Sequence, residues 1–180
     1  MISIYIPERE YYDDDTNTFY VTQGRVVNFE YCLLAIARWE SKWKIPFLSS
    51  NINATDPKLL DFYIMMSDDP QLIPQELTKD VIVKLKEYME DTHTATTFND
   101  NGHPSGGRSK TYTSEEFYAL MAMNGVPIEF EKRHLSNLLA ILRIISIYND
   151  PNPKKMSKTE VMSQNAKLNE LRKKQYGTKG

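Results

Sequence analysis

The chain has 180 residues, of which 41% are hydrophobic and 11% aromatic, so it can build a core and is not a wholly disordered protein. Its single cysteine, Cys32, excludes an intramolecular disulfide framework and is typical of a reducing compartment. Every apolar run is shorter than the ~20 residues of a membrane span, and the first residues lack the pattern of a secretory signal. We therefore expect a soluble, intracellular protein without a membrane partner.

Charge is unevenly distributed along the chain. The formal net charge is −2, but residues 154–180 carry eight basic and two acidic side chains, a net charge of +6. The remaining residues carry 14 basic and 22 acidic side chains, a net charge of −8. A basic segment attached to an acidic body can bind nucleic acid, bind an acidic partner or fold back on its own body. It can also be a solvated helix whose charges serve only solubility.

The first 25 residues predict a small β-hairpin. Ile2, Ile4 and Ile6 alternate with other residues, and the run 19–22 is rich in aromatic and β-branched side chains. The polar residues 11–17 between these two stretches are typical of a turn.

Helical periodicity begins after the hairpin. It predicts a first helix from Val27 to Lys44, with Asn28 as its N-cap and Pro46 just beyond its end. A second helix is expected to start at residues 55–57, where a proline follows an aspartate, and a third near Thr78.

The second half of the chain predicts further helices after an irregular stretch, 91–112. One starts at a capping box formed by Thr113 and Glu116, and a strongly apolar one covers residues 129–148. We expect Leu138, Leu139 and Leu142 to be buried in the latter. A polar helix is predicted from Ser157 to about Gln175.

These elements predict a mainly α fold in two parts. The first is a helical bundle-like body with a small N-terminal β-hairpin, over residues 1–153, and the second is a basic C-terminal helical arm over 154–180.

The residue patterns do not indicate an active site. The run from Gly102 to Ser109 has the spacing of a phosphate-binding P-loop, but no buried strand leads into it and no helix leaves it. His93, His103 and His134 lack metal-ligand spacing, and Cys32 lies on an apolar helix face where a structural thiol is expected. We expect a non-enzymatic protein with no catalytic residue, no cofactor and no metal.

Partner-binding residues are the remaining candidates. Trp39 and Trp43 lie one helical turn apart among basic side chains, so they could stack on a partner, although tryptophans more often pack in a core. The C-terminal arm adds apolar and basic side chains that could dock on another chain. The candidate partner-binding set is Trp39, Trp43, Leu168, Leu171, Arg172, Lys173 and Lys174.

Three blocks of sequence together resemble a known family. They are 38–48 with its Trp-Glu-Ser-Lys-Trp core, 94–98, and the basic C-terminal stretch 155–180 that ends in Gly-Thr-Lys-Gly. The chain is similar, over nearly its whole length, to proteins encoded among the virion morphogenesis genes of tailed bacteriophages. Members of that family are described as tail assembly chaperones or as phage structural proteins.

The resemblance implies a role in virion assembly. A tail assembly chaperone binds the long, partly apolar tape-measure protein while the tail tube polymerises around it, in the cytoplasm of the host cell. The alternative is a structural component of the virion, a head–tail connector or tail protein. Expected partners are other phage morphogenesis proteins, with a homo-oligomer as a further possibility, and nucleic acid is not expected.

Overall fold

The computed structural model describes residues 1–13, 17–50, 52, 56–96 and 112–150, together with isolated positions between 162 and 177. The chain divides into two units, Met1–Ile145 and Ser146–Gly180. Beyond Asp150, the second unit is helical at Met162, Asn165, Ala166, Asn169, Glu170 and Lys173, and Gly177 lies in a turn. Most of the predicted C-terminal arm, including Leu168, Leu171, Arg172 and Lys174, lies outside the described residues.

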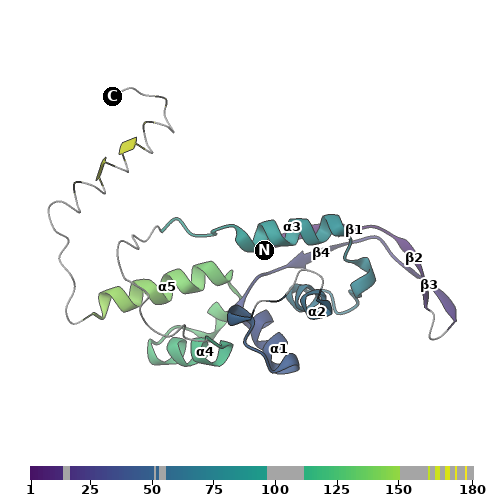
Figure 1. Ribbon diagram of the computed structural model, residues 1–180, viewed down its shortest axis with the longest axis horizontal. Coiled ribbons are helices and arrows are strands. Elements are labelled where there is room, and N and C mark those ends of the chain that lie inside the picture. Colours follow the sequence, from purple (N-terminus) through teal and green to yellow (C-terminus); the bar gives the residue numbers. More distant parts are fainter. Residues whose placement is uncertain are drawn as a thin grey trace. The chain divides into compact units, whose positions relative to one another are not determined.

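The first unit begins with the predicted N-terminal β-hairpin, a two-stranded ribbon that contains two successive ladders (Figure 1). Strand β1 (Ile2–Ile6) pairs antiparallel with β4 (Arg25–Phe29), and β2 (Arg9–Asp13) pairs antiparallel with β3 (Thr18–Thr22). The pairs Ile6–Arg25 and Arg9–Thr22 keep one register across the gap between the two ladders. Because proline cannot donate a ladder hydrogen bond, the gap falls at Pro7 and the residues around it.

Five α-helices follow the ribbon in the part of the chain that the structure describes. They are α1 (Leu33–Trp43), α2 (Pro57–Met66), α3 (Lys79–Glu90), α4 (Ser114–Met123) and α5 (Leu135–Tyr148). Short 3₁₀ turns, η1 (Phe47–Ser49), η2 (Pro74–Glu76) and η3 (Ile128–Lys132), join them. The start of α2 follows the prediction, since Asp56 caps it by accepting from the Lys58 N–H and Pro57 occupies its first position.

The main core lies between the base of the ribbon and the first three helices. Alternate residues of β1 and β4 face inward, so Ile4, Ile6, Val27 and Phe29 are buried against side chains of α1, α2 and α3. The buried helix residues include Ile36, Trp39, Phe62, Tyr63 and Leu85. A second, smaller cluster joins the start of α1 to α4 and α5 through Leu33, Phe117, Met121 and Leu138.

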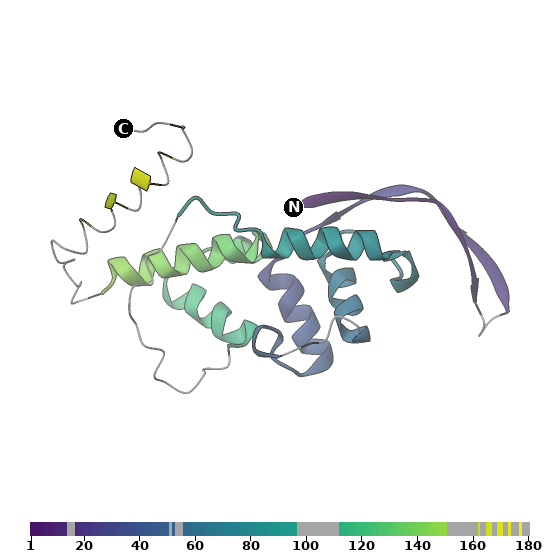
Figure 2. The same ribbon diagram turned by 45° about the horizontal axis from the view of Figure 1, so that its top comes forward.

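The predicted helical bundle is wrong, because the described residues form five α-helices and two small sheets without a clear bundle. In Figure 2, α1 and α2 run across the direction of α3 and α5 instead of alongside it. The ribbon base supplies the layer on which α3 lies, which is the place that another helix would take in a bundle. The N-terminal hairpin itself is confirmed.

The predicted first helix also begins too early. Residues 25–29 are strand β4, and the helix starts only at Leu33, after Cys32, whose side chain makes no cap hydrogen bond. Phe29 also fits an α-helical spacing to Leu33, but Val27 and Phe29 alternate on the strand and are buried opposite Ile4 and Ile2. Pairing with β1 therefore decides the conformation here, since strand preference depends on the partner surface.

The strongly apolar helix is also shorter than predicted. Residues 128–132 form the 3₁₀ turn η3, and α5 begins at Leu135. The helical conformation is interrupted at His134, which forms an isolated β-bridge with Cys32. The next N–H, that of Leu135, donates to the Tyr31 carbonyl at 2.8 Å. Of the three leucines expected in the core, Leu138 is buried, Leu142 is half-buried and Leu139 is exposed.

Candidate protein-interaction surface

The two ladders of the ribbon turn opposite faces toward the helices. At the base, Ile4, Ile6 and Val27 face the core. Beyond the gap, Tyr11 is half-buried, and its hydroxyl donates to the Gln75 carbonyl of η2 at 3.4 Å. Tyr11 belongs to the opposite alternation from Ile4 and Ile6, so the other face of the ribbon points inward here. Two-stranded ribbons twist more than wider sheets, which allows this reversal.

The reversal exposes an apolar face at the tip of the ribbon. Tyr12 pairs with Phe19 across the strands, and Val21 lies two residues further along β3 on the same side. Their exposed fractions are 47%, 74% and 53%. The rings of Tyr12 and Phe19 contact each other, with centroids 4.8 Å apart, and the Tyr12 hydroxyl donates to the Asn17 side chain. We call Tyr12, Phe19 and Val21 the tip face.

Two exposed acidic residues, Glu8 and Glu10, lie beside the tip face. Glu10 pairs directly with Val21, Glu8 lies at the gap, and both are exposed. The turn beyond the tip has the sequence Asp13-Asp14-Asp15, of which only the backbone of Asp13 is described. Arg9 is the single basic residue in this stretch. The tip therefore combines exposed aromatic area with negative charge, the chemistry of a docking site for a basic, partly apolar segment.

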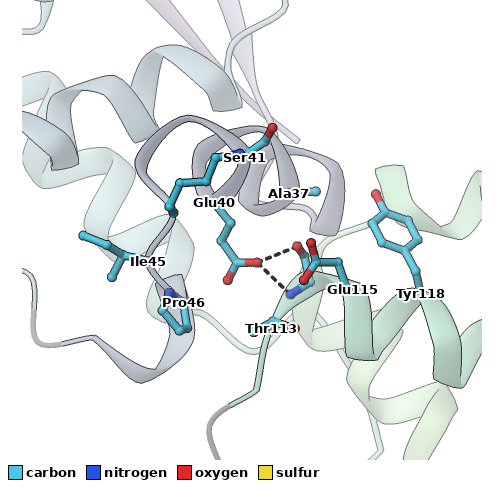
Figure 3. A pocket seen from close by; sticks show the side chains of 10 residues that line it. Ala37, Glu40, Ser41, Ile45, Pro46, Thr113, Glu115 and Tyr118 are labelled. Atoms are coloured by element: carbon cyan, nitrogen blue, oxygen red, sulfur yellow. Dashed lines mark hydrogen bonds between the residues drawn. The ribbon is translucent and has the colours of Figure 1, made fainter.

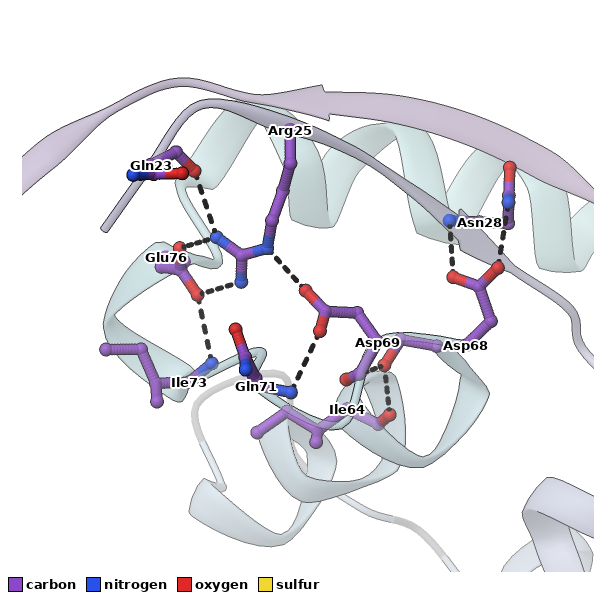
Figure 4. A network of polar contacts seen from close by, with 10 residues as sticks. Gln23, Arg25, Asn28, Ile64, Asp68, Asp69, Gln71, Ile73 and Glu76 are labelled. Carbon is purple, nitrogen blue, oxygen red and sulfur yellow. Dashed lines mark hydrogen bonds and ion pairs between the residues drawn. The ribbon is translucent and has the colours of Figure 1, made fainter.

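A partly buried ion-pair network fixes the ribbon just before the tip (Figure 4). The guanidinium of Arg25 in β4 donates to both carboxylate oxygens of Glu76 at 2.7 and 2.9 Å, and its Nε donates to Asp69 at 2.5 Å. Glu76 is 1% exposed and also accepts from the Ile73 N–H at 3.1 Å. The bidentate geometry ties β4 to the segment between α2 and α3, so the tip projects from a rigid base.

The ionisation of this network follows from its contacts. Burial alone would raise the pKa values of Glu76 and Asp69, but the hydrogen bonds and charge of Arg25 bring both below their usual values. The pKa of Arg25 is raised in turn, chiefly by its hydrogen bonds to Glu76 and Asp69. The three groups are therefore charged at neutral pH, as an anchor requires.

A second region of interest contains Glu40, inside the block 38–48, beside a pocket of about 380 Å³ (Figure 3). One carboxylate oxygen accepts from the Phe47 N–H at 2.8 Å, and the other accepts from the N–H and hydroxyl of Ser114 at 2.7 and 2.5 Å. These bonds join α1 to η1 and to the first turn of α4. Because three donors already engage the carboxylate, Glu40 has a positioning role in the fold and is a poor general base.

A third region is an open cleft of about 720 Å³, lined by Glu30, His93 and His134 among other residues. The two imidazole rings contact each other with centroids 4.2 Å apart, and Tyr31 and Tyr88 pack on His134. His134 is 5% exposed, and its Nε2, like that of His93, is buried without a hydrogen-bond partner among the described atoms. Burial, followed by the nearby His93, lowers the pKa of His134, so the ring is neutral at pH 7.

Cys32 lies near this cleft but does not favour nucleophilic chemistry. Burial raises the pKa of its thiol, and the side chain is buried at the start of α1. In the part of the chain that the structure describes, no group of three or more His, Cys, Asp or Glu side chains could hold a metal ion. The P-loop-like run 102–109 and the third histidine, His103, lie outside the described residues.

The structure separates the residues of the predicted partner-binding set. Trp39 is fully buried, and its indole N–H donates to the Lys58 carbonyl at 2.7 Å, so it packs in the core. Trp43 is half-buried, with the ammonium groups of Lys42 and Lys58 above its ring at 5.2 and 5.3 Å. Lys173 is an exposed helical residue of the second unit. The tryptophan pair thus offers a partner only the outer part of Trp43.

The tip face was missed by the sequence analysis. The pattern 19–22 does indicate a strand, but alternation alone does not tell which face of a strand covers a core and which is exposed. The signal that could have found it is the acidic run beside two aromatic residues, since such charges seldom lie next to a buried sheet face.

The comparisons with known proteins do not supply an identity. No family model matches the chain, and neither the curated proteins nor the solved structures include a match. No helix among the described residues is both long enough and apolar enough to cross a membrane.

Proposed function

We propose that this chain is a non-enzymatic protein of tailed-phage virion assembly, a tail assembly chaperone that binds the tape-measure protein. The observation that carries the protein-binding role is the exposed tip face on a ribbon anchored by Arg25 and Glu76. The phage role rests on the resemblance of blocks 38–48, 94–98 and 155–180 to that family.

The tip face suits a chaperone that holds an extended, partly apolar chain. Tyr and Phe bury a large area for little loss of rotamer freedom, so they are favoured anchors at protein interfaces. The surrounding acidic side chains keep such a surface hydrated until a partner arrives. A partner with alternating apolar and basic residues would satisfy both features.

The test is co-expression of the chain with the tape-measure protein of the same phage, followed by affinity capture. We expect Phe19→Ser to weaken capture at least tenfold and the control Met123→Ser, at an exposed methionine of α4, to leave it unchanged. Equal capture by both variants would remove the tip face from the proposal. Capture by neither the parent chain nor the variants would contradict the chaperone role.

The composition of purified particles separates the chaperone from the structural alternative. A chaperone leaves the assembly, so mass spectrometry should find the chain absent from particles or present only in traces. Stoichiometric presence would instead assign it to a head–tail connector or tail protein.

A further inference from the structure

We infer that His93 and His134 form a pH-sensitive contact, which holds the segment after α3, residues 91–96, against the start of α5 and opens when either ring is protonated. His93 belongs to this segment, and His134 directly precedes α5. The inference concerns the first unit alone and is independent of the phage role proposed above.

Ring contacts attach residues 92–96 to the rest of the first unit. The His93 ring packs edge-to-face on that of His134, with centroids 4.2 Å apart, and Tyr88 contacts the two rings at 4.8 and 5.1 Å. Among the described residues, the hydrogen bonds and ion pairs of residues 92–96 stay within the segment 91–96. The contact between the two imidazoles therefore holds this segment to α5 without the support of a hydrogen bond between them.

His134 fits its surroundings as an uncharged ring. Its Nδ1 accepts from the Ser136 N–H at 3.4 Å and lies 2.8 Å from the Ser136 hydroxyl, so the proton of the neutral ring belongs on Nε2. That Nε2 and the Nε2 of His93 are buried without a hydrogen-bond partner among the described atoms. A second proton on His134 turns Nδ1 into a donor that faces the Ser136 N–H, and it places a charge in a buried position.

Glu30 is the carboxylate that lines the cleft beside the pair, and both of its oxygens are engaged. One lies 2.6 Å from the Met1 ammonium, and the other accepts from the Tyr88 hydroxyl at 2.6 Å. Glu30 therefore offsets only part of the cost of charging His134. The pKa of His134 is lowered first by burial and then by the nearby His93.

The remaining charged groups direct a protonated His93 toward solvent. The cleft that the ring lines also contains two cations, Lys132 and Arg133, which repel an imidazolium. Asp91 lies 3.8 Å from Nδ1 of His93 and is 65% exposed, so the attracting charge is at the surface. The other titratable groups packed at His134, which burial keeps uncharged by raising their pKa values, are Tyr31, Cys32 and Tyr88.

Two cavities meet at this segment. Thr94 lines both the cleft of about 720 Å³ and a second cavity of about 410 Å³, whose walls also include Leu139 and Ala140 of α5. Displacement of residues 91–96 merges the two cavities and uncovers this apolar side of α5. The histidine contact is thus a switch that is closed at neutral pH and open in acid.

The test follows the isotope-labelled full-length chain by NMR at about pH 7.5 and about pH 5.5, on either side of the usual histidine range. We expect nuclear Overhauser contacts between the two imidazole rings at the higher pH and their loss at the lower pH. The backbone order parameters of residues 92–96 should fall from about 0.85 to below about 0.6. The indole N–H signal of Trp39, which is buried in the core, should stay in place and so report an intact fold.

A double variant, His93→Phe with His134→Phe, keeps two packed rings that cannot be protonated. Its order parameters should be the same at both pH values. It retains the third histidine, His103, so the comparison is specific for the pair. If the double variant does not fold, His93→Phe alone replaces it, because the His93 side chain is 32% exposed and tolerates substitution better. This single variant should lose less order than the parent chain at the lower pH.

The inference is overturned if the contacts between the rings persist at the lower pH, or if residues 92–96 are already disordered at the higher pH. An equal response to pH in the parent chain and the variant also overturns it. These measurements contain no phage partner, so their failure leaves the capture experiment of the proposed function to be judged separately.

Discussion

The base and the tip of the ribbon have the same pairing register but opposite surroundings. At the base, Phe29 is fully buried beneath α1 and α2, whereas Phe19 at the tip is 74% exposed. Both are phenylalanines on antiparallel strands of one hairpin, so local propensity cannot distinguish them. The difference arises from what lies under each strand, and the twist between the ladders decides which face finds a helix.

The largest expected effect is on stability at the base. Phe29→Ala should lower the free energy of unfolding by about 3–5 kcal/mol, because it removes a buried ring and leaves a cavity. Phe19→Ala should change it by no more than about 0.5 kcal/mol, because the ring is mostly in solvent. Chemical denaturation of the two variants measures the contrast, and a large loss for Phe19→Ala would show that the tip is covered.

The anchor between base and tip should be almost as sensitive. Arg25→Met leaves the buried carboxylate of Glu76 unpaired, so we expect a loss of about 3–5 kcal/mol. The double variant Arg25→Met, Glu76→Met removes both charges and should regain most of that loss. If the double variant is no more stable than Arg25→Met, the network does not act as a coupled pair.

The same anchor gives stability a dependence on acid. The folded-state pKa values of Glu76 and Asp69 are lowered, so their contribution is present above their unfolded-state values near about 4. It is lost as the pH falls through the folded-state values. Arg25→Met should flatten this part of the stability profile, and an unchanged profile would contradict the lowered pKa values.

A smaller effect is expected at His134, away from the ribbon. Its lowered pKa means that the unfolded state binds a proton more readily, so stability falls as the pH drops through the unfolded value of about 6.5. Unfolding of the parent chain and of His134→Gln between about pH 8 and about pH 5.5 measures the slope. The slope should shrink in His134→Gln, and an equal slope in the two proteins would contradict the lowered pKa of His134.

The smallest effect is expected at Gly24, in the gap between the two ladders. A Cβ there would lie 2.5 Å from the hydroxyl of Tyr5, but this side chain is exposed and can move. We expect Gly24→Ala to cost less than about 1 kcal/mol. A Tyr5→Phe background removes the hydroxyl contact and leaves the contacts at 3.3 Å to the ring carbon and to the Glu8 backbone nitrogen, so the cost should fall further, as thermal unfolding can measure.

Signals within a few residues of each other were read correctly from the sequence. The starts of α2 at Asp56 and Pro57, α3 at Thr78 and α4 at Thr113 depend on side chains that cap a neighbouring N–H, and the structure has these caps. The presence of the hairpin follows for the same reason, because alternation is a local feature. Its turn was predicted to start too early, since residues 11–13 belong to strand β2 and β1 pairs with β4.

Features that depend on distant segments were not predicted. Residues 25–29 became a strand because β1 pairs with them, and the long apolar helix broke at His134 because its backbone pairs with Cys32. To predict the tip face, one would have to know how the ribbon twists. To predict the burial of Trp39, one would have to know that α2 packs beside it. In each case, one stretch of sequence fits two structures equally well, and only a remote contact decides between them.

The segment between β4 and α1 has a consequence for the order of folding during synthesis. Together with the end of β4, its backbone bonds to two later parts of the chain, at Met66–Asp68 and at Leu135, through the Glu30 N–H, the Asn28 carbonyl and the Tyr31 carbonyl. A ribosome synthesises more than a hundred further residues between Tyr31 and Leu135. Until Leu135 has been synthesised, the nascent ribbon therefore has unpaired polar groups and an uncovered apolar base. Contacts between residues so far apart in sequence form slowly, and the exposed base favours misassociation between nascent chains in that interval.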